Sequence, residues 1–188
     1  LWRDAPRWDS NHRATVRRWP RRSSMNFAGK KETLRHCLLN IVEEQHKVLL
    51  LCGAPGTGKS AFATHIGNHL LLRKKIASVR KLDVARLAAL SQLHSLSGLE
   101  QLLVRRFLPS NVSRPRLIVL DGVDDFVVSC MARLLLMLES KVIQYNVVFL
   151  LTFSSREGPW SGGRHPRFVL PTLAPLAARR AAERRLKG

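Results

Sequence analysis

Residues 48–60 read VLLLCGAPGTGKS, an apolar run followed directly by a glycine-rich loop with the spacing Gly53-x-x-x-x-Gly58-Lys59-Ser60. Glycines permit positive φ angles and let backbone N–H groups close around an anion that a side chain would exclude. Lys59 adds a compact positive charge, and the Ser60 hydroxyl is an oxygen ligand that suits Mg²⁺. The stretch therefore predicts a phosphate-binding loop.

The segments on either side of the loop occur in the order that such a loop requires. Residues 47–52 are β-branched and leucine-rich, as in a buried parallel strand, and residues 61–73 have helical spacing. This order places the N-terminus of a helix, with its free N–H groups, against the phosphates. We therefore expect ATP or ADP to bind here. The predicted nucleotide contacts are Gly53, Ala54, Pro55, Gly56, Thr57, Gly58, Lys59, Ser60 and Ala61.

Length and composition favour one domain, because 188 residues with 45% hydrophobic side chains can form a substantial core. No apolar run approaches the roughly 20 residues of a membrane span. Cys37, Cys52 and Cys130 lie singly in apolar segments without metal-ligand spacing, so we expect buried thiols in a reducing compartment. The expected location is the cytoplasm, with the nucleus as the alternative.

The net charge of +19 is concentrated at the two ends of the chain. Residues 1–24 carry seven arginines and two aspartates, and residues 161–188 carry seven basic residues and one glutamate, so these ends hold more than half of the excess. Residues 1–24 lack apolar periodicity and run up to Met25, and we interpret them as a basic disordered tail or a gene-model artefact. The basic ends are the only support for a nucleic-acid partner.

Downstream of the tail, helices and strands are predicted to alternate. Residues 30–44 place Leu34, Leu38 and Ile41 on one helical stripe, and residues 75–84 are a strand candidate. The leucines between 87 and 103 predict two short helices, the second capped by the Ser-x-x-Glu spacing of Ser97 and Glu100.

The stretch RLIVLDGVDDF at 116–126 contains a second set of polar residues. Its apolar run, 117–120, predicts a buried strand that ends in Asp121. The carboxyl end of that strand lies at the same sheet edge as the loop. Asp121 is therefore the expected partner of Ser60 in holding Mg²⁺ through water.

Two further acids, Asp124 and Asp125, follow about one turn later. Either carboxylate could orient or deprotonate an attacking water, since a general base needs only to lie within hydrogen-bond reach. The alternative is that both acids form a polar turn and cap a helix at 127–140. The residues alone leave these readings open.

The stretch NVVFLLTFSSR at 146–156 predicts another buried strand, which ends in Thr152, Ser154, Ser155 and Arg156. Polar residues at this position point into the crevice beside the loop. Arg156 could therefore reach the γ-phosphate of a bound nucleotide. A surface arginine in a loop is the competing interpretation.

In this order, the segments resemble the STAND class of AAA+-related P-loop ATPases, which includes the NACHT and NB-ARC switch proteins. FAGKKETL at 27–34 is similar to the F-x-G-R-x-x-E-L segment on the adenine side, with Lys30 where arginine is usual. GAPGTGKS is a Walker A motif. LIVLDGVDD is similar to the NACHT-type Walker B motif, with Asp125 in place of glutamate.

Two more segments extend the resemblance toward the end of the chain. LLTFSSR resembles the strand ending in T-S-R that serves as sensor 1, with two additional residues between Thr152 and the Ser-Arg pair. VLPTLAPLAARRAAERRL at 169–186 resembles the closing strand and the L-x-P-L opening of a helical lid. The resemblance implies a P-loop NTPase domain at 25–172 and the start of a truncated lid at 173–188.

The resemblance also implies a fold and a function. The fold is a three-layer α/β sandwich with a five-stranded parallel sheet in the order 5-1-4-3-2, numbered along the chain. The function is Mg²⁺-ATP binding with slow hydrolysis, used as a switch that acts on protein partners through flanking domains. Lys59, Asp121, Asp124 or Asp125, and Arg156 are the implied catalytic residues.

Two alternatives from other classes remain. A DNA-acting AAA+ ATPase of the origin-recognition or helicase-loader type also uses a GxPGTGKS loop and would account for the basic ends. Such proteins normally have glutamate directly after the Walker B aspartate, where Gly122 stands here. A degenerate nucleotide-binding domain that serves as an interaction module is the other alternative.

Overall fold

The computed structural model describes residues 30–89, 95–108, 113–124, 131–154 and 165–170. In chain order the elements are α1 (Lys31–Val42), β1 (Val48–Cys52), α2 (Lys59–Leu72), β2 (Ser78–Asp83), α3 (Val84–Ala89), α4 (Leu96–Leu102), a π-helical turn (Leu103–Phe107), β3 (Arg116–Asp121), α6 (Met131–Gln144), β4 (Val147–Phe153) and β5 (Arg167–Val169). The domain boundaries expected near residues 24 and 172 lie outside the described residues.

The strands form a parallel five-stranded sheet in the order β2-β3-β4-β1-β5. Read from the other edge, this is the predicted order 5-1-4-3-2, which is therefore confirmed. β1 and β4 are buried at every position, and β3 at every position after Arg116. Their continuous apolar sequences suit central parallel strands covered on both faces. The edge strands β2 and β5 are more polar and partly exposed.

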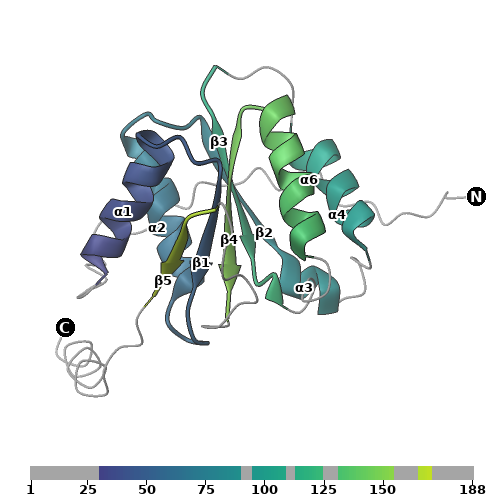
Figure 1. The fold of residues 1–188 in the computed structure, drawn as a ribbon, viewed down its shortest axis with the longest axis horizontal. Helices are drawn as coiled ribbons and strands as arrows, with labels where there is room; N and C mark the ends of the chain where they lie inside the picture. The colour runs from purple at the N-terminus through teal and green to yellow at the C-terminus, as the bar shows by residue number, and fades with distance from the viewer. Residues whose placement is uncertain (1–29, 90–94, 109–112, 125–130, 155–164, 171–188) are drawn as a thin grey trace, which may run out of the picture.

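Helices cover both faces of the sheet and complete a three-layer sandwich, with α1 and α2 on one side and α4 and α6 on the other (Figure 1). Alternate residues of each central strand enter opposite cores, as the two-residue strand period requires. In β4, Val148 and Leu150 pack with α1 and α2, whereas Phe149 and Leu151 pack with α4 and α6. Among the described helices, none is both long and apolar enough to cross a membrane.

The two short helices predicted between 87 and 103 are confirmed as α3 and α4, but the predicted cap at Ser97 is wrong. Ser95 is the N-cap of α4, since its backbone is extended and its Oγ accepts a hydrogen bond from Gly98 N at 3.1 Å. Ser97 lies inside the first turn, where its Oγ is 2.9 Å from that of Ser95.

Several element boundaries also differ from those predicted. β2 is shorter than 75–84, and α6 continues past the predicted end at residue 140 to Gln144. The closing strand was expected to begin at 169, but β5 ends there. Its pairing with β1 is bounded by hydrogen bonds from Leu50 N to Pro166 O and from Leu170 N to Cys52 O. The strand therefore precedes the segment that resembles the start of a lid.

The central strand β4 offers a test of the fold. Leu150 is fully buried, so Leu150→Ala should lower the free energy of unfolding by about 2–5 kcal/mol through lost burial and the cavity left behind. Leu72 is 84% exposed, so Leu72→Ala should change it by less than about 0.5 kcal/mol. Urea unfolding of both variants measures the difference. Equal effects would contradict this placement of β4.

Candidate nucleotide-binding site

The glycine-rich loop joins the carboxyl end of β1 to the first turn of α2. Gly58 is the N-cap of α2 with φ of +82°, a left-handed conformation that glycine adopts without strain. Thr57 N donates to Ala54 O at 3.2 Å and folds the loop into a turn. Thr57 Oγ1 is buried and has no hydrogen-bond partner among the described residues. A helix N-terminus beside an unpaired hydroxyl fits a bound phosphate.

The Lys59 side chain is buried and bends back over the loop. Its ammonium donates to Gly53 O at 2.8 Å and to Ala54 O at 3.0 Å. These acceptors are neutral carbonyls, and an anionic phosphate oxygen is a stronger acceptor for an ammonium. The Lys59 ammonium thus lies within the loop, where a phosphate oxygen could replace the two carbonyls as its acceptor.

Lys30 supplies a second cation to the same loop. It is buried at the start of α1, and its Nζ donates to Thr57 O at 2.5 Å. Burial lowers the pKa of this ammonium below its ordinary value. Lys30, which was expected on the adenine side of the nucleotide, therefore contacts the phosphate-binding loop directly.

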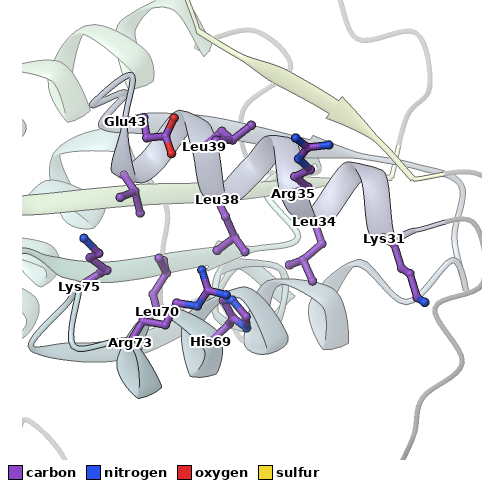
Figure 2. A pocket seen from close by; sticks show the side chains of 11 residues that line it. Lys31, Leu34, Arg35, Leu38, Leu39, Glu43, His69, Leu70, Arg73 and Lys75 are labelled. Carbon is purple, nitrogen blue, oxygen red and sulfur yellow. The ribbon is translucent and has the colours of Figure 1, made fainter.

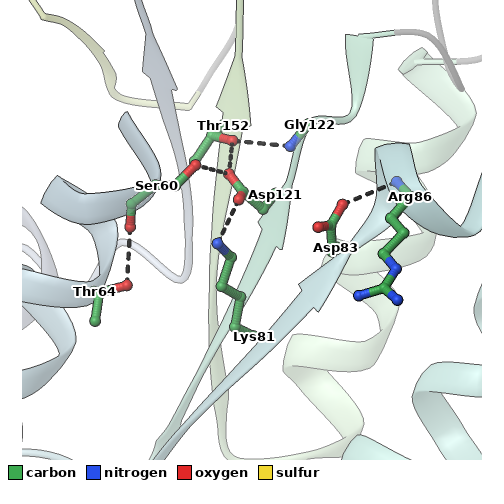
Figure 3. Close-up of polar contacts among 8 residues, drawn as sticks. All are labelled: Ser60, Thr64, Lys81, Asp83, Arg86, Asp121, Gly122 and Thr152. Atoms are coloured by element: carbon green, nitrogen blue, oxygen red, sulfur yellow. Dashed lines mark hydrogen bonds and ion pairs between the residues drawn. The ribbon is translucent and has the colours of Figure 1, made fainter. Parts of the chain in front are cut away.

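Three elements meet at the Asp121 carboxylate (Figure 3). Ser60 Oγ, from α2, donates to Asp121 Oδ1 at 2.8 Å, and Thr152 Oγ1, from β4, donates to the same oxygen at 2.6 Å. The two predicted metal ligands, Ser60 and Asp121, are therefore adjacent. The described residues contain no cluster of three or more His, Cys, Asp or Glu side chains that could hold a metal. This donor set fits Mg²⁺, which commonly takes its remaining ligands from water and nucleotide phosphates.

Lys81, from β2, is part of the site although no local motif singles it out. Its Nζ lies 2.6 Å from Asp121 Oδ2. Burial acts to raise the pKa of Asp121, but hydrogen bonds from Lys81, Thr152 and Ser60 outweigh it and hold the pKa below its ordinary value. The carboxylate is therefore ionised at neutral pH.

The strand register would have revealed Lys81. It pairs with Val119, and Val119 precedes Asp121 by two residues on β3. Paired residues share one face of a sheet, as do residues two apart, so Lys81 and Asp121 lie on the same face. That inference requires knowing which strand neighbours β3, which the local pattern does not show.

The residues after Asp121 are fixed by backbone contacts. Gly122 has φ of +68°, its N–H donates to Thr152 Oγ1 at 3.0 Å, and a Cβ there would lie 2.8 Å from Ala85 Cβ. Glycine is thus required at the position directly after Asp121. The Asp124 carboxylate accepts the Ser154 N–H, with its two oxygens 2.7 and 2.8 Å from the nitrogen.

The predicted site residues fall into two groups. The loop residues, Ser60 and Asp121 lie together, and Asp124 follows Asp121 at the same sheet edge, against the end of β4. Asp125 and Arg156 lie outside the described residues, so their roles stay predictions. Thr152 was expected in the crevice and contacts Asp121 there.

A hollow of about 310 Å³ between α1 and α2 is separate from this site (Figure 2). Leucines of α1 line it together with His69 and Leu70 from the C-terminal half of α2 and with Arg73, the residue that follows this helix. The phosphate-binding loop joins the opposite end of α2, and none of its residues lines the hollow. The hollow is therefore not the phosphate site.

The family model described as "ATPase family associated with various cellular activities (AAA)" matches residues 49–157. The chain belongs to the AAA family. The matched region of this AAA domain includes the loop, Asp121 and Thr152. A comparison with curated proteins gives no significant match.

Solved structures share the fold of this AAA domain at low sequence identity. A structure of C. elegans PCH-2 is 16% identical with a TM-score of 0.53, and the match covers 76% of this chain and 43% of that one. A structure of an E. coli MS115-1 HORMA:CdnC:Trip13 complex is 13% identical with a TM-score of 0.61, covering 85% and 68%. Drosophila ORC bound to DNA is 13% identical with a TM-score of 0.56, covering 86% and 48%. The chain thus spans less than half the length of two of these relatives.

The buried Thr152 hydroxyl offers a test of the Asp121 cluster. Thr152→Val keeps the shape but removes the donor to Asp121 and the acceptor for Gly122 N–H, so the free energy of unfolding should fall by about 1–3 kcal/mol. Thr152→Ser keeps the hydroxyl and should lose less. Urea unfolding compares the two, and a valine variant as stable as the serine variant would contradict the network.

Proposed function

We propose that this AAA domain binds ATP or ADP with Mg²⁺ and acts as a nucleotide-dependent switch of the STAND type with slow hydrolysis. The observation that supports this most is the contact between Ser60 Oγ and Asp121 Oδ1 at 2.8 Å. It joins the phosphate-binding loop to the carboxylate at the end of β3, as a shared metal site requires.

Each polar group has a role in this proposal. The loop N–H groups, Lys59 and Lys30 neutralise phosphate charge, and the Thr57 hydroxyl offers one more hydrogen bond. Ser60 would bind the metal directly and Asp121 through water. Held by these two residues, the metal would supply positive charge beside the phosphates for phosphoryl transfer. Because its carboxylate is ionised, Asp121 can accept a hydrogen bond from such a water.

Slow hydrolysis follows from the acids available for the water. Asp124 already accepts the Ser154 N–H through its carboxylate, which limits its freedom to act as a base. Asp125, which stands where glutamate is usual, has a side chain shorter by one methylene. We propose that Asp124 or Asp125 orients the water and that Arg156 senses the γ-phosphate.

The switch itself depends on a second state that nucleotide can favour. We propose that the segment 27–34, which overlaps the start of α1, faces the nucleotide and that a lid follows β5, as the STAND resemblance implies. We propose that protein partners act through such flanking parts. One structurally similar protein belongs to a complex, the E. coli MS115-1 HORMA:CdnC:Trip13 complex.

Lys59 provides the direct test of nucleotide binding. Lys59→Ala removes the cation inside the loop and should abolish the thermal stabilisation that Mg²⁺-ATP gives to the wild type, about 2.7 kcal/mol when ATP is present at 100 times its Kd. Lys75→Ala removes an exposed lysine just past the opposite end of α2 and should retain the stabilisation. Unchanged stabilisation in Lys59→Ala would disprove the assignment.

Two observations favour a DNA-acting AAA+ ATPase as a second candidate function. The net charge is +19, and the similar structures include Drosophila ORC bound to DNA and a DNA replication initiation factor. For that function, duplex DNA should stimulate ATP turnover. The apparent affinity for DNA should fall steeply as the salt concentration rises, because protein binding releases counterions from the DNA. Turnover that DNA leaves unchanged at low salt would exclude it. Nucleotide binding without any ATP turnover would instead favour the other alternative, a degenerate nucleotide-binding domain that serves as an interaction module.

A further inference from the structure

Lys81 and Asp121 form an ion pair that spans the boundary between solvent and the sheet interior. The Lys81 side chain is 41% exposed and the Asp121 side chain 12% exposed, with Nζ and Oδ2 2.6 Å apart. Figure 3 shows the lysine reaching from β2 to the carboxylate that Ser60 and Thr152 approach from the other side. The exposed partner of the pair is thus the one that can move away.

The Asp121 carboxylate has little acceptor capacity left. Each carboxylate oxygen has about two acceptor sites. Oδ1 accepts the hydroxyls of Ser60 and Thr152, and Oδ2 accepts the Lys81 ammonium. A water in the shell of Mg²⁺ would therefore have to bind at Oδ2, beside or in place of the ammonium.

Charge makes that competition stronger. The ammonium neutralises the carboxylate that would attract the metal, and two cations at one partly buried carboxylate repel each other. Another acid that could bind the Lys81 ammonium or the metal is Asp83 on β2, which pairs in register with Asp121. Its Oδ1 accepts the Arg86 N–H at 2.9 Å at the start of α3, so that oxygen is already in use.

We propose that Lys81 is a tethered cation that competes with Mg²⁺ for Asp121 and so weakens the dependence of nucleotide binding on the metal. The proposal rests on the proposed function, because it concerns the same site. In the metal-free state Lys81 holds the carboxylate, and Mg²⁺ loading displaces its ammonium toward solvent. The flexible four-carbon stem of lysine permits this movement without a change in the strand.

This competition gives the domain two arrangements of one side chain, one without the metal and one with it. A ligand shifts such an equilibrium by its difference in affinity for the two states. Lys81 lies on the edge strand β2, which pairs only with β3 among the described strands. Metal binding at Asp121 would therefore change the position of a side chain at the edge of the sheet.

The test compares nucleotide affinity with and without the metal. Isothermal titration gives the Kd of the wild-type chain for ADP and for an ATP analogue that cannot be hydrolysed, in Mg²⁺ and in excess EDTA. The ratio of the Kd in EDTA to the Kd in Mg²⁺ measures how strongly nucleotide binding depends on the metal. Lys81→Met keeps the length of the side chain without its charge, and the ratio should increase about tenfold, equivalent to about 1.4 kcal/mol.

Two control variants separate competition from general charge and from misfolding. Arg80→Met removes one positive charge from the adjacent, exposed position of β2 and should keep the wild-type ratio. Lys81→Arg keeps the cation and should also keep a low ratio. Circular dichroism and thermal unfolding without nucleotide verify that each variant is folded.

The outcomes separate this inference from the proposed function. An unchanged or smaller ratio in Lys81→Met, with nucleotide still bound, would overturn the inference alone. An equal increase in Arg80→Met would also overturn it, because the effect would then be one of net charge. Absence of nucleotide binding in every variant would refute the proposed function and this inference with it.

Discussion

The Asp121 carboxylate is the interaction on which the site depends. It accepts hydrogen bonds from α2 through Ser60 and from β4 through Thr152, and it forms an ion pair with β2 through Lys81. A buried carboxylate is costly unless its charge is compensated. Three donors from three elements provide that compensation, so the strand ends and the start of α2 are held in one arrangement. This arrangement fixes the position of the phosphate-binding loop.

The sheet explains why these groups meet. β1, β3 and β4 are adjacent and parallel, so their carboxyl ends lie along one edge. Their apolar sequences bury both faces and confine polar residues to the positions where the strands end. Thr152 near the end of β4 and Asp121 at the end of β3 follow this pattern. The buried core thereby fixes the geometry of a polar site.

Much of this arrangement could be predicted because the signals are local. The loop spacing, the strand ending in Asp121 and the apolar run of β4 are each readable within a dozen residues. The strand order followed from the family resemblance. Lys81 escaped prediction because its role depends on which strand neighbours β3. The cap at Ser95 escaped because Ser97 has the same side chain and a better downstream spacing, and only backbone geometry separates the two.

The most direct test of a nucleotide site organised by Asp121 is amide hydrogen exchange with and without Mg²⁺-ATP. The account predicts slower exchange in residues 53–61 and at the carboxyl ends of β3 and β4, because phosphates and metal would bind the loop N–H groups and stabilise the Asp121 network. Exchange that is unchanged in the loop, or slowed only around the hollow between α1 and α2, would contradict it.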